Sequence, residues 1–351
     1  MAVFRSSVLL IYTGGTIGMA EDPSTGQLTP FRFDHLTSQV PELKKFGVSI
    51  HAVSFEHPLD SSDMKPEIWV KMAEMIAENY DVYDGFVILH GSDTMAYTAS
   101  ALSFMLQHLG KPVILTGSQL PIGTIRTDGK ENLITAIEIA AAKNETGQPM
   151  VPEVAIYFEY RLLRGNRTTK VSANHFNAFA SGNYPELAEA GVTISWNHQD
   201  IRPLPAEKFI LNKKLCADIA ILKIFPGIPP FVVKAICSNP SLKGLILETF
   251  GSGNATTDTW FIDELQALVG RGVPVINVTQ CYSGSVQQGK YKTSSAFNEI
   301  GVISGHDMTT EAAVTKLMCL LGNNTDLYEI RQAFASSFCG EVTVPSATGN
   351  V

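Results

Sequence analysis

The sequence predicts an α/β protein of two domains: a larger N-terminal three-layer α/β domain with a mostly parallel sheet, and a smaller C-terminal α/β domain. Its 351 residues exceed what one typical hydrophobic core holds. Short continuous apolar runs alternate with segments of helical period, as in repeated strand–helix–strand units. A proline-containing stretch at 200–206 interrupts this alternation, which then resumes, so two separate sheets are expected.

Four apolar runs in the N-terminal half predict buried parallel strands, because their apolar residues are continuous rather than alternating: 8–12, 86–90, 113–116 and 154–158. Three segments between them predict helices: 66–80, 95–109 and 131–143. Pro66 suits the first turn of a helix, and one helical stripe follows it through Ile68, Met72, Met75, Ile76 and Asn79. The strand–helix–strand units predict right-handed crossovers.

The C-terminal half repeats the pattern on a smaller scale. Its apolar runs predict strands at 219–225, 244–249, 273–279 and 301–304, and its amphipathic segments predict helices at 231–238, 258–269, 309–321 and 326–334. We therefore expect an N-terminal domain over 1–205, a linker over 206–217 and a C-terminal domain over 218–351.

Composition excludes several classes of function. The formal net charge of −8 argues against a nucleic-acid-binding surface, and no basic run is longer than Lys213-Lys214. The histidines form no HExxH pattern, so a structural metal is not expected. We also expect no cofactor. The five cysteines are widely spaced and predict core thiols in a reducing compartment: Cys216, Cys237, Cys281, Cys319 and Cys339.

No apolar run approaches the length of a membrane helix, and the one at the N-terminus is too short for a signal sequence. We expect a cytoplasmic protein without membrane contact.

Polar residues gather where the predicted strands end, and ligands of open parallel sheets bind beyond the carboxyl ends of strands. TGGTIG (13–18) follows the first strand, HGSDT (90–94) the second, TGS (116–118) the third, and RGNRTTK (164–170) comes after the fourth. DSSD (60–63) precedes the first long helix and adds hydroxyls and backbone N–H groups. Hydroxyls, one aspartate and one lysine are therefore expected at one edge of the sheet, with Thr94 as a helix cap.

These motifs, in this order, resemble the cytoplasmic (type I) bacterial asparaginases of the asparaginase/glutaminase family. The likeness extends through nearly the whole chain and includes GSGNA at 251–255 and VTQC at 278–281. The resemblance implies that the first domain is catalytic and hydrolyses L-asparagine to L-aspartate and ammonia. It also implies a homodimer or homotetramer with sites at the subunit contact.

Carried over residue by residue, the resemblance makes Thr16 the nucleophile. Ser92 stands where the family has its second catalytic threonine, with Asp93 and Lys170 beside it. By the same match, the residues that bind substrate are Gly15, Ser61, Ser62, Ser92, Asp93 and Ser118, with a possible contribution of Asn254 from a neighbouring subunit. The two serines at 61–62 would hold the α-carboxylate, Asp93 the α-ammonium, and Ser118 would line the side-chain pocket.

The chemistry of amide hydrolysis suits these residue types. An acyl-enzyme ester replaces one difficult step by two easier ones, a base must activate the hydroxyl, and N–H donors must hold the oxyanion. Residues 19–33 suggest a mobile flap but contain no tyrosine to serve as that base. A carboxylate beside Lys170 favours its ammonium form, so the lysine acts as a base only if burial outweighs that attraction, and otherwise acts electrostatically.

Two other functions fit the same motifs. One is the amidase subunit of a tRNA-dependent amidotransferase, and the other is a non-catalytic module that binds asparagine or aspartate.

The resemblance also bears on allosteric regulation by asparagine. Some cytoplasmic asparaginases bind a second, allosteric asparagine around an arginine, and the alignment puts Glu248 at its place. Thr169, Cys281 and Asn254 match other parts of that pocket. Glutamate would repel the effector carboxylate, so we expect no cooperativity. The simpler alternative is that Glu248 caps a strand end or pairs with a nearby lysine.

Overall fold

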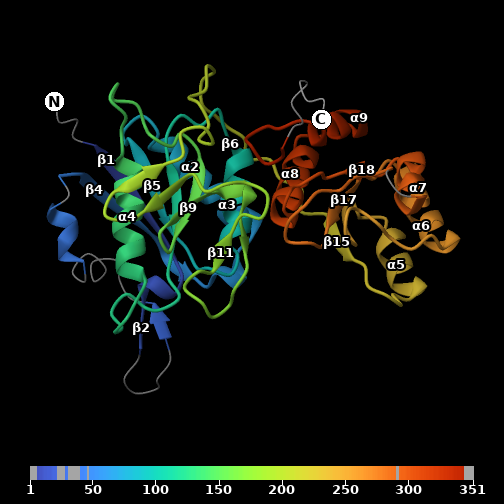
Figure 1. Cartoon of the computed structure of the whole chain (residues 1–351), viewed down its shortest axis with the longest axis horizontal. Helices are drawn as coiled ribbons and strands as arrows, with labels where there is room; N and C mark the ends of the chain where they lie inside the picture. The colour runs from blue at the N-terminus through green and yellow to red at the C-terminus, as the bar shows by residue number, and fades with distance from the viewer. Residues whose placement is uncertain (1–5, 22–27, 31–39, 46, 290–291, 344–351) are drawn as a thin grey trace. The chain divides into compact units, whose positions relative to one another are not determined.

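The computed structural model describes residues 6–21, 28–30, 40–45, 47–289 and 292–343 (Figure 1). The chain divides into two compact units, Met1–Asn212 and Lys213–Val351. Among the described residues, no helix is long and apolar enough to cross a membrane. Nor do the histidine, cysteine, aspartate and glutamate side chains of this part of the chain form a group that could hold a metal ion.

The first unit is built on one twisted sheet whose strand order is β13-β12-β9-β8-β7-β5-β1-β4. Its strands are β1 (Ser7–Gly14), β4 (Ser49–Leu59), β5 (Gly85–Leu89), β7 (Val113–Thr116), β8 (Val154–Phe158), β9 (Arg161–Arg164), β12 (Ala188–Ala190) and β13 (Ile194–Trp196). The pairings from β4 through β8 are parallel, and those from β8 through β13 are antiparallel. The prediction of a mostly parallel sheet in a two-domain α/β fold is confirmed.

The sequence did not predict β4, which pairs in parallel with β1 from Ser7↔Ser49 to Tyr12↔Ser54. This strand lies at the edge of the sheet, and most of its side chains are exposed or half-buried. Polar residues such as His51 and Glu56 therefore interrupt its apolar pattern. A continuous apolar run identifies only strands that are buried on both faces.

Three helices of the first unit match the prediction in place and differ at their ends: α2 (Pro66–Glu78), α3 (Met95–Met105) and α4 (Gly129–Ala141). On α2, the most buried residues are Trp69, Met72, Ala73 and Ile76, whereas Ile68 and Met75 are only half-buried. Helix α3 ends at Met105 because the chain then forms a short strand, β6 (Leu106–Gln107), that pairs with β14 (Ile210–Leu211).

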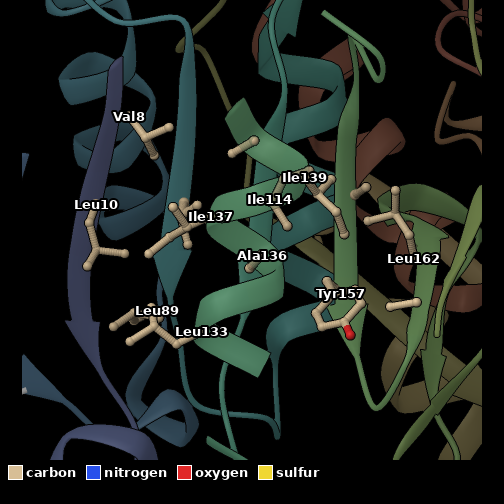
Figure 2. Close-up of a cluster of buried hydrophobic side chains, with 14 of the residues drawn as sticks. Val8, Leu10, Leu89, Ile114, Leu133, Ala136, Ile137, Ile139, Tyr157 and Leu162 are labelled. Atoms are coloured by element: carbon tan, nitrogen blue, oxygen red, sulfur yellow. The ribbon is translucent and has the colours of Figure 1, made fainter. Parts of the chain in front are cut away.

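Helix α4 covers one face of the sheet and forms a continuous apolar core with it. Figure 2 shows Leu133, Ala136 and Ile137 of α4 facing strand residues such as Leu10 and Ile114. All of these side chains are fully buried, and each large aliphatic one contributes about 1.5 to 3 kcal/mol to the hydrophobic stabilisation. This core fixes the strands whose carboxyl ends carry the polar motifs.

The connection from β8 to the RGNRTTK segment differs from the prediction. A tight hairpin at Glu159-Tyr160 turns the chain into β9, which is antiparallel to β8 and places Arg164 opposite Ala155. The segment therefore starts near the amino end of β8, where Gly165 lies against the Val154 carbonyl. It then passes through the 3₁₀ helix η4 (Gly165–Arg167) before it reaches β10 (Thr169–Lys170). The predicted direct path from the carboxyl end of β8 is wrong.

The second unit has a parallel sheet of order β15-β16-β17-β18. Its elements are β15 (Ile219–Lys223), α5 (Pro230–Cys237), β16 (Gly244–Thr249), α6 (Thr259–Gly270), β17 (Val275–Thr279), α7 (Lys292–Ile300), β18 (Ile303–Ser304), α8 (Thr310–Gly322) and α9 (Leu327–Phe334). The four predicted strands and four predicted helices are present with small shifts, and α7 was not predicted. The four described strands of this sheet follow one another in sequence order.

The five cysteines are all free thiols. Cys237, Cys319 and Cys339 are buried, and burial raises the pKa of Cys237 and of Cys319 to about 11. Cys216 is half-buried, and Cys281 is exposed because it lies in the turn after β17. The prediction of five core thiols is therefore wrong for Cys281.

Candidate active site

The turn that carries Thr16 begins where β1 ends. Gly14 and Gly15 have φ angles of 131° and 87°, which favour glycine, and the chain then enters the 3₁₀ helix η1 (Thr16–Gly18). A Cβ atom on Gly15 would lie 2.5 Å from the backbone nitrogen of Gly91. Glycine at 15 therefore lets the Thr16 turn contact the loop that follows β5 directly.

The loop at 60–63 joins the same contact region. A Cβ atom on Gly91 would lie 2.5 Å from Oγ of Ser61, so these two loops also touch. The Thr94 hydroxyl donates to the Ser61 carbonyl at 2.7 Å. It does not cap α3, because no side-chain cap bond forms there, so the prediction of a helix cap is wrong. Thr94 instead ties two site loops together.

Ser62 is exposed, and it is held by its neighbour in the 60–63 loop. The Asp60 carboxylate accepts hydrogen bonds from the Ser62 amide at 2.9 Å and from the Ser62 hydroxyl at 2.7 Å. These bonds keep the pKa of Asp60 below its usual value. The two bonds give the loop a defined shape, and the Ser62 hydroxyl donates to Asp60.

Lys170 links the two residues that follow Gly91. Its Nζ donates to Ser92 Oγ at 2.9 Å and lies 2.5 Å from Asp93 Oδ1. The lysine side chain is 17% exposed, whereas that of Asp93 is 64% exposed and open to solvent. Residues about 78 positions apart in sequence are therefore brought together, as predicted, although by a longer route.

Ser118 lies on the other side of the Thr16 turn. It is buried, and its hydroxyl donates to the Leu120 carbonyl at 2.5 Å. A Cβ atom on Gly129 would lie 3.2 Å from both Ser118 Cβ and Ile17 Cγ1, so the two residues flank the same point at the start of α4. Five of the predicted residues, Gly15, Ser61, Ser92, Asp93 and Ser118, thus follow the strand ends, and Lys170 joins them through its side chain.

Thr16 itself is half-buried, and none of the described residues hydrogen-bonds to its hydroxyl. Asn254 lies in the second unit, in a turn closed by the hydrogen bond from the Phe250 amide to the Asn254 carbonyl. Its contribution to a neighbouring subunit's site stays a prediction. The flap at 19–33 is described only as a hairpin of β2 (Met19–Glu21) and β3 (Leu28–Pro30), and the remainder of it lies outside the described residues.

Gln119 was not predicted as a site residue. Its Oε1 accepts a long hydrogen bond of 3.4 Å from the Ser92 hydroxyl, and its Nε2 donates to the His175 carbonyl at 2.9 Å. It therefore connects Ser92 to the loop after Lys170. Only its position next to the TGS motif could have suggested this role, because the contact joins residues far apart in sequence.

His90 was also missed, and it supports the loop from below. It is fully buried, and its Nδ1 lies 2.6 Å from the Gly91 carbonyl, which can only accept, so Nδ1 carries the proton. Nε2 then accepts from the Thr98 hydroxyl at 2.9 Å, and the Thr98 oxygen accepts from Trp69 Nε1 at 2.9 Å. Burial lowers the pKa of His90 to about 4, so the ring is neutral at pH 7.

This pKa predicts a pH-dependent stability. The unfolded chain protonates His90 near pH 6.5, and the folded protein only near pH 4, so acid favours the unfolded state between these values. The free energy of unfolding should fall by about 3 kcal/mol across that window from this residue alone. Urea unfolding at pH 7 and pH 5 measures the effect.

The control is His90→Asn, which does not titrate but keeps an amide donor near the Gly91 carbonyl. Other groups, including His306, whose pKa is also lowered by burial, contribute equally to both proteins. The wild type should therefore lose more stability than the variant between pH 7 and pH 5. Equal losses would show that His90 is not the group responsible.

The comparisons with known proteins agree with this geometry. The family model described as "Asparaginase, N-terminal" matches residues 7–202, and the "Glutaminase/Asparaginase C-terminal domain" matches residues 218–334. The chain belongs to the asparaginase family. The two matches fall within the two compact units, one in each.

Individual relatives of the family resemble the chain over nearly its whole length. L-asparaginase 1 of Escherichia coli K12 is 45% identical, with 97% of this chain and 98% of that one covered. The crystal structure of L-asparaginase I from Vibrio cholerae has a TM-score of 0.88 and 40% identity, covering 97% of this chain and all of that one. A glutamyl-tRNA(Gln) amidotransferase subunit of Pyrococcus abyssi is 33% identical, with 96% of this chain and 76% of that one covered.

Glu248, which the alignment with some asparaginases puts in the place of an arginine, is occupied locally. Its Oε1 accepts from the Thr310 hydroxyl at 2.6 Å, and its Oε2 lies 3.2 Å from Lys223 Nζ. The alternative in which Glu248 pairs with a nearby lysine is therefore confirmed. This carboxylate stands near the carboxyl end of β16.

Proposed function

We propose that this asparaginase-family protein hydrolyses L-asparagine to L-aspartate and ammonia, with Thr16 as the nucleophile of an acyl-enzyme mechanism. The observation that carries the proposal is the contact of Lys170 Nζ with Ser92 Oγ and Asp93 Oδ1, next to the glycine contact that holds the Thr16 turn. An unengaged hydroxyl at this point is available to a substrate carbon.

The substrate is a zwitterion, and the site offers partners for both charges. The Asp93 side chain is mostly exposed despite its contact with Lys170, so its carboxylate is accessible to an α-ammonium group. Ser61 and Ser62 are the proposed partners of the α-carboxylate: the Ser61 hydroxyl lies next to Gly91, and the Ser62 hydroxyl would exchange its bond to Asp60 for one to the ligand. Together they would hold the side-chain amide near Thr16.

Lys170 Nζ forms an ion pair with Asp93 Oδ1 at 2.5 Å. We therefore infer that Lys170 works electrostatically and as a donor that orients the Ser92 hydroxyl. Ser92 accepts from Lys170 and makes only a long bond to Gln119, so its own proton is available to the departing nitrogen. In the first step Thr16 Oγ bonds to the amide carbon, Ser92 gives its proton to the amide nitrogen and recovers one from the Thr16 hydroxyl, and the C–N bond breaks to release ammonia. In the second step water cleaves the ester, which gives aspartate and returns the proton to Thr16 Oγ.

A coupled assay for ammonia, with aspartate measured in parallel, tests the activity. Equal amounts of both products from L-asparagine support hydrolysis. Binding of aspartate without any release of ammonia would instead indicate the non-catalytic module. Glutamine is the natural comparison, because one methylene changes selectivity by only about 1 to 3 kcal/mol.

The alternative role, as the amidase subunit of a tRNA-dependent amidotransferase, would require binding of tRNA. A net charge of −8 disfavours binding of tRNA. Hydrolysis of free L-asparagine without tRNA or a partner subunit would exclude this role as the main one.

The assembly and location are proposals of the same kind. We propose a homodimer or homotetramer that acts in the cytoplasm, without a metal, a nucleic acid or a membrane as partner. Light scattering coupled to size-exclusion chromatography measures the molar mass of the assembly and thus the number of subunits.

The kinetics should be hyperbolic. An effector asparagine would bring its α-carboxylate toward the place that Glu248 holds, and the two carboxylates repel each other. Initial rates at increasing L-asparagine should fit a Hill coefficient of about 1. A clearly higher coefficient that disappears in Cys281→Ala or Thr169→Ala would contradict this expectation.

A further inference from the structure

Tyr12 lies directly beneath the turn that presents Thr16. It stands in β1, is 2% exposed, and belongs to the apolar cluster between the sheet and α4. Its hydroxyl donates to the Gly18 carbonyl at 3.0 Å. A side chain of the core thus reaches the backbone of the site.

Every carbonyl of the turn accepts a hydrogen bond. The Gly15 carbonyl accepts from the Gly18 amide at 3.2 Å, and the Thr16 carbonyl accepts from the amide that follows the turn. The Ile17 carbonyl accepts from the Ile122 amide at 3.3 Å. The Gly18 carbonyl differs from these three, because its donor is a side chain, that of Tyr12.

The ring of Tyr12 and the residue at 18 fit each other closely. A Cβ atom on Gly18 would lie 2.0 Å from the Tyr12 oxygen and 2.3 Å from its Cζ. Only glycine therefore allows the ring to lie against the turn. At the opposite end of the turn, Gly15 lies against Gly91. The turn that carries Thr16 is therefore held by a close contact at each of its two ends, Gly15 and Gly18.

We propose that Tyr12 is a positioning residue for the reaction: its hydroxyl holds the Gly18 carbonyl and thereby sets the turn that presents Thr16, an inference that rests on the proposed role of Thr16. Tyr12 does not act as the base in this account, because its proton is engaged with a carbonyl. Burial raises the pKa of Tyr12 to about 12, so the hydroxyl keeps its proton at neutral pH.

The test is Tyr12→Phe, which removes one oxygen and leaves the ring. Tyr157→Phe is the matched control, because Tyr157 is buried in the same cluster (labelled in Figure 2) and donates instead to Glu131 Oε1 at 3.2 Å. A displacement of the nucleophile of about 1 Å costs roughly 100-fold. We expect kcat of Tyr12→Phe to fall roughly 10- to 100-fold, with KM within about threefold of wild type. Tyr157→Phe should keep the wild-type kcat.

Two further readouts separate positioning from other roles. The pH midpoints of kcat/KM should be the same in Tyr12→Phe and wild type, whereas a shifted midpoint would make Tyr12 a proton acceptor and overturn the inference. The two variants should also lose similar thermal stability. If Tyr12→Phe lost much more thermal stability than Tyr157→Phe and kept the wild-type kcat, Tyr12 would have only a structural role and the inference would be wrong.

Thr16→Ala, assayed alongside, distinguishes the two proposals. If it is inactive while Tyr12→Phe turns over at the wild-type rate, only the role of Tyr12 is wrong. If Thr16→Ala is active, the nucleophile itself is wrong.

Discussion

Thr16→Ala is expected to lose turnover of L-asparagine by roughly 10⁴-fold or more while it still binds aspartate with nearly the wild-type affinity. The reason is that no described residue engages the Thr16 hydroxyl, which leaves it available to attack the substrate. Its removal deletes the attacking atom without disturbing the groups proposed to hold the zwitterion. Steady-state kinetics give the loss in kcat, and calorimetric titration with aspartate gives the affinity.

Thr13 provides the control within the same motif. It is buried, and its hydroxyl donates to the Leu89 carbonyl at 2.8 Å, so it joins β1 to β5. Thr13→Val should lower stability by about 1 to 3 kcal/mol, because it leaves a buried carbonyl without its donor, and should leave kcat within a few fold. If Thr13→Val were inactive and Thr16→Ala active, the assignment of the two threonines would be reversed.

Lys170→Met is expected to lower kcat by roughly 10² to 10⁴-fold. Methionine keeps most of the length and the apolar contacts of the lysine chain, but it loses the Nζ that bonds Ser92 and Asp93. The Ser92 hydroxyl would then be unoriented, and its proton transfer to the leaving nitrogen would slow. Turnover measured at saturating L-asparagine checks this.

Lys143→Met is the matched control, because Lys143 also pairs with an aspartate, Asp84, at 2.9 Å. That pair lies at the amino ends of β1 and β5, where Asp84 also accepts from the Ser7 amide. The variant therefore shows how much kcat falls when a lysine–aspartate pair outside the site is removed. Similar falls of kcat in both lysine variants would remove Lys170 from the mechanism.

The strand ends could be predicted from the sequence because parallel strands share one carboxyl edge. Continuous apolar runs identified β1, β5, β7 and β8, and the motifs after the first three lie where that rule puts them. Composition could not show the antiparallel turn after β8. Glu159 and Tyr160 adopt positive φ angles of 43° and 68°, a conformation for which asparagine and glycine are the usual signal.

The other features that the sequence did not predict are side-chain contacts, not helices or strands. Thr94 has the residue type and position of a helix cap, yet its hydroxyl bonds the Ser61 carbonyl, because that loop is packed against Gly91. His90, Gln119 and Tyr12 act through partners whose proximity depends on the folded sheet. Local pattern assigns residue types to elements, whereas such partners follow only from the tertiary structure.

The proposal that hydrolysis passes through an ester on Thr16 is tested by acid-quenched mass spectrometry of the wild-type protein during turnover of saturating L-asparagine. Acid stops both the formation of the ester and the attack of water on it, so the ester present at the moment of quenching is preserved. We expect the intact protein to gain the mass of aspartate less one water, and peptide mapping to place the gain on Thr16. An adduct on Ser92 instead, or hydrolysis that proceeds without any adduct, would contradict the account.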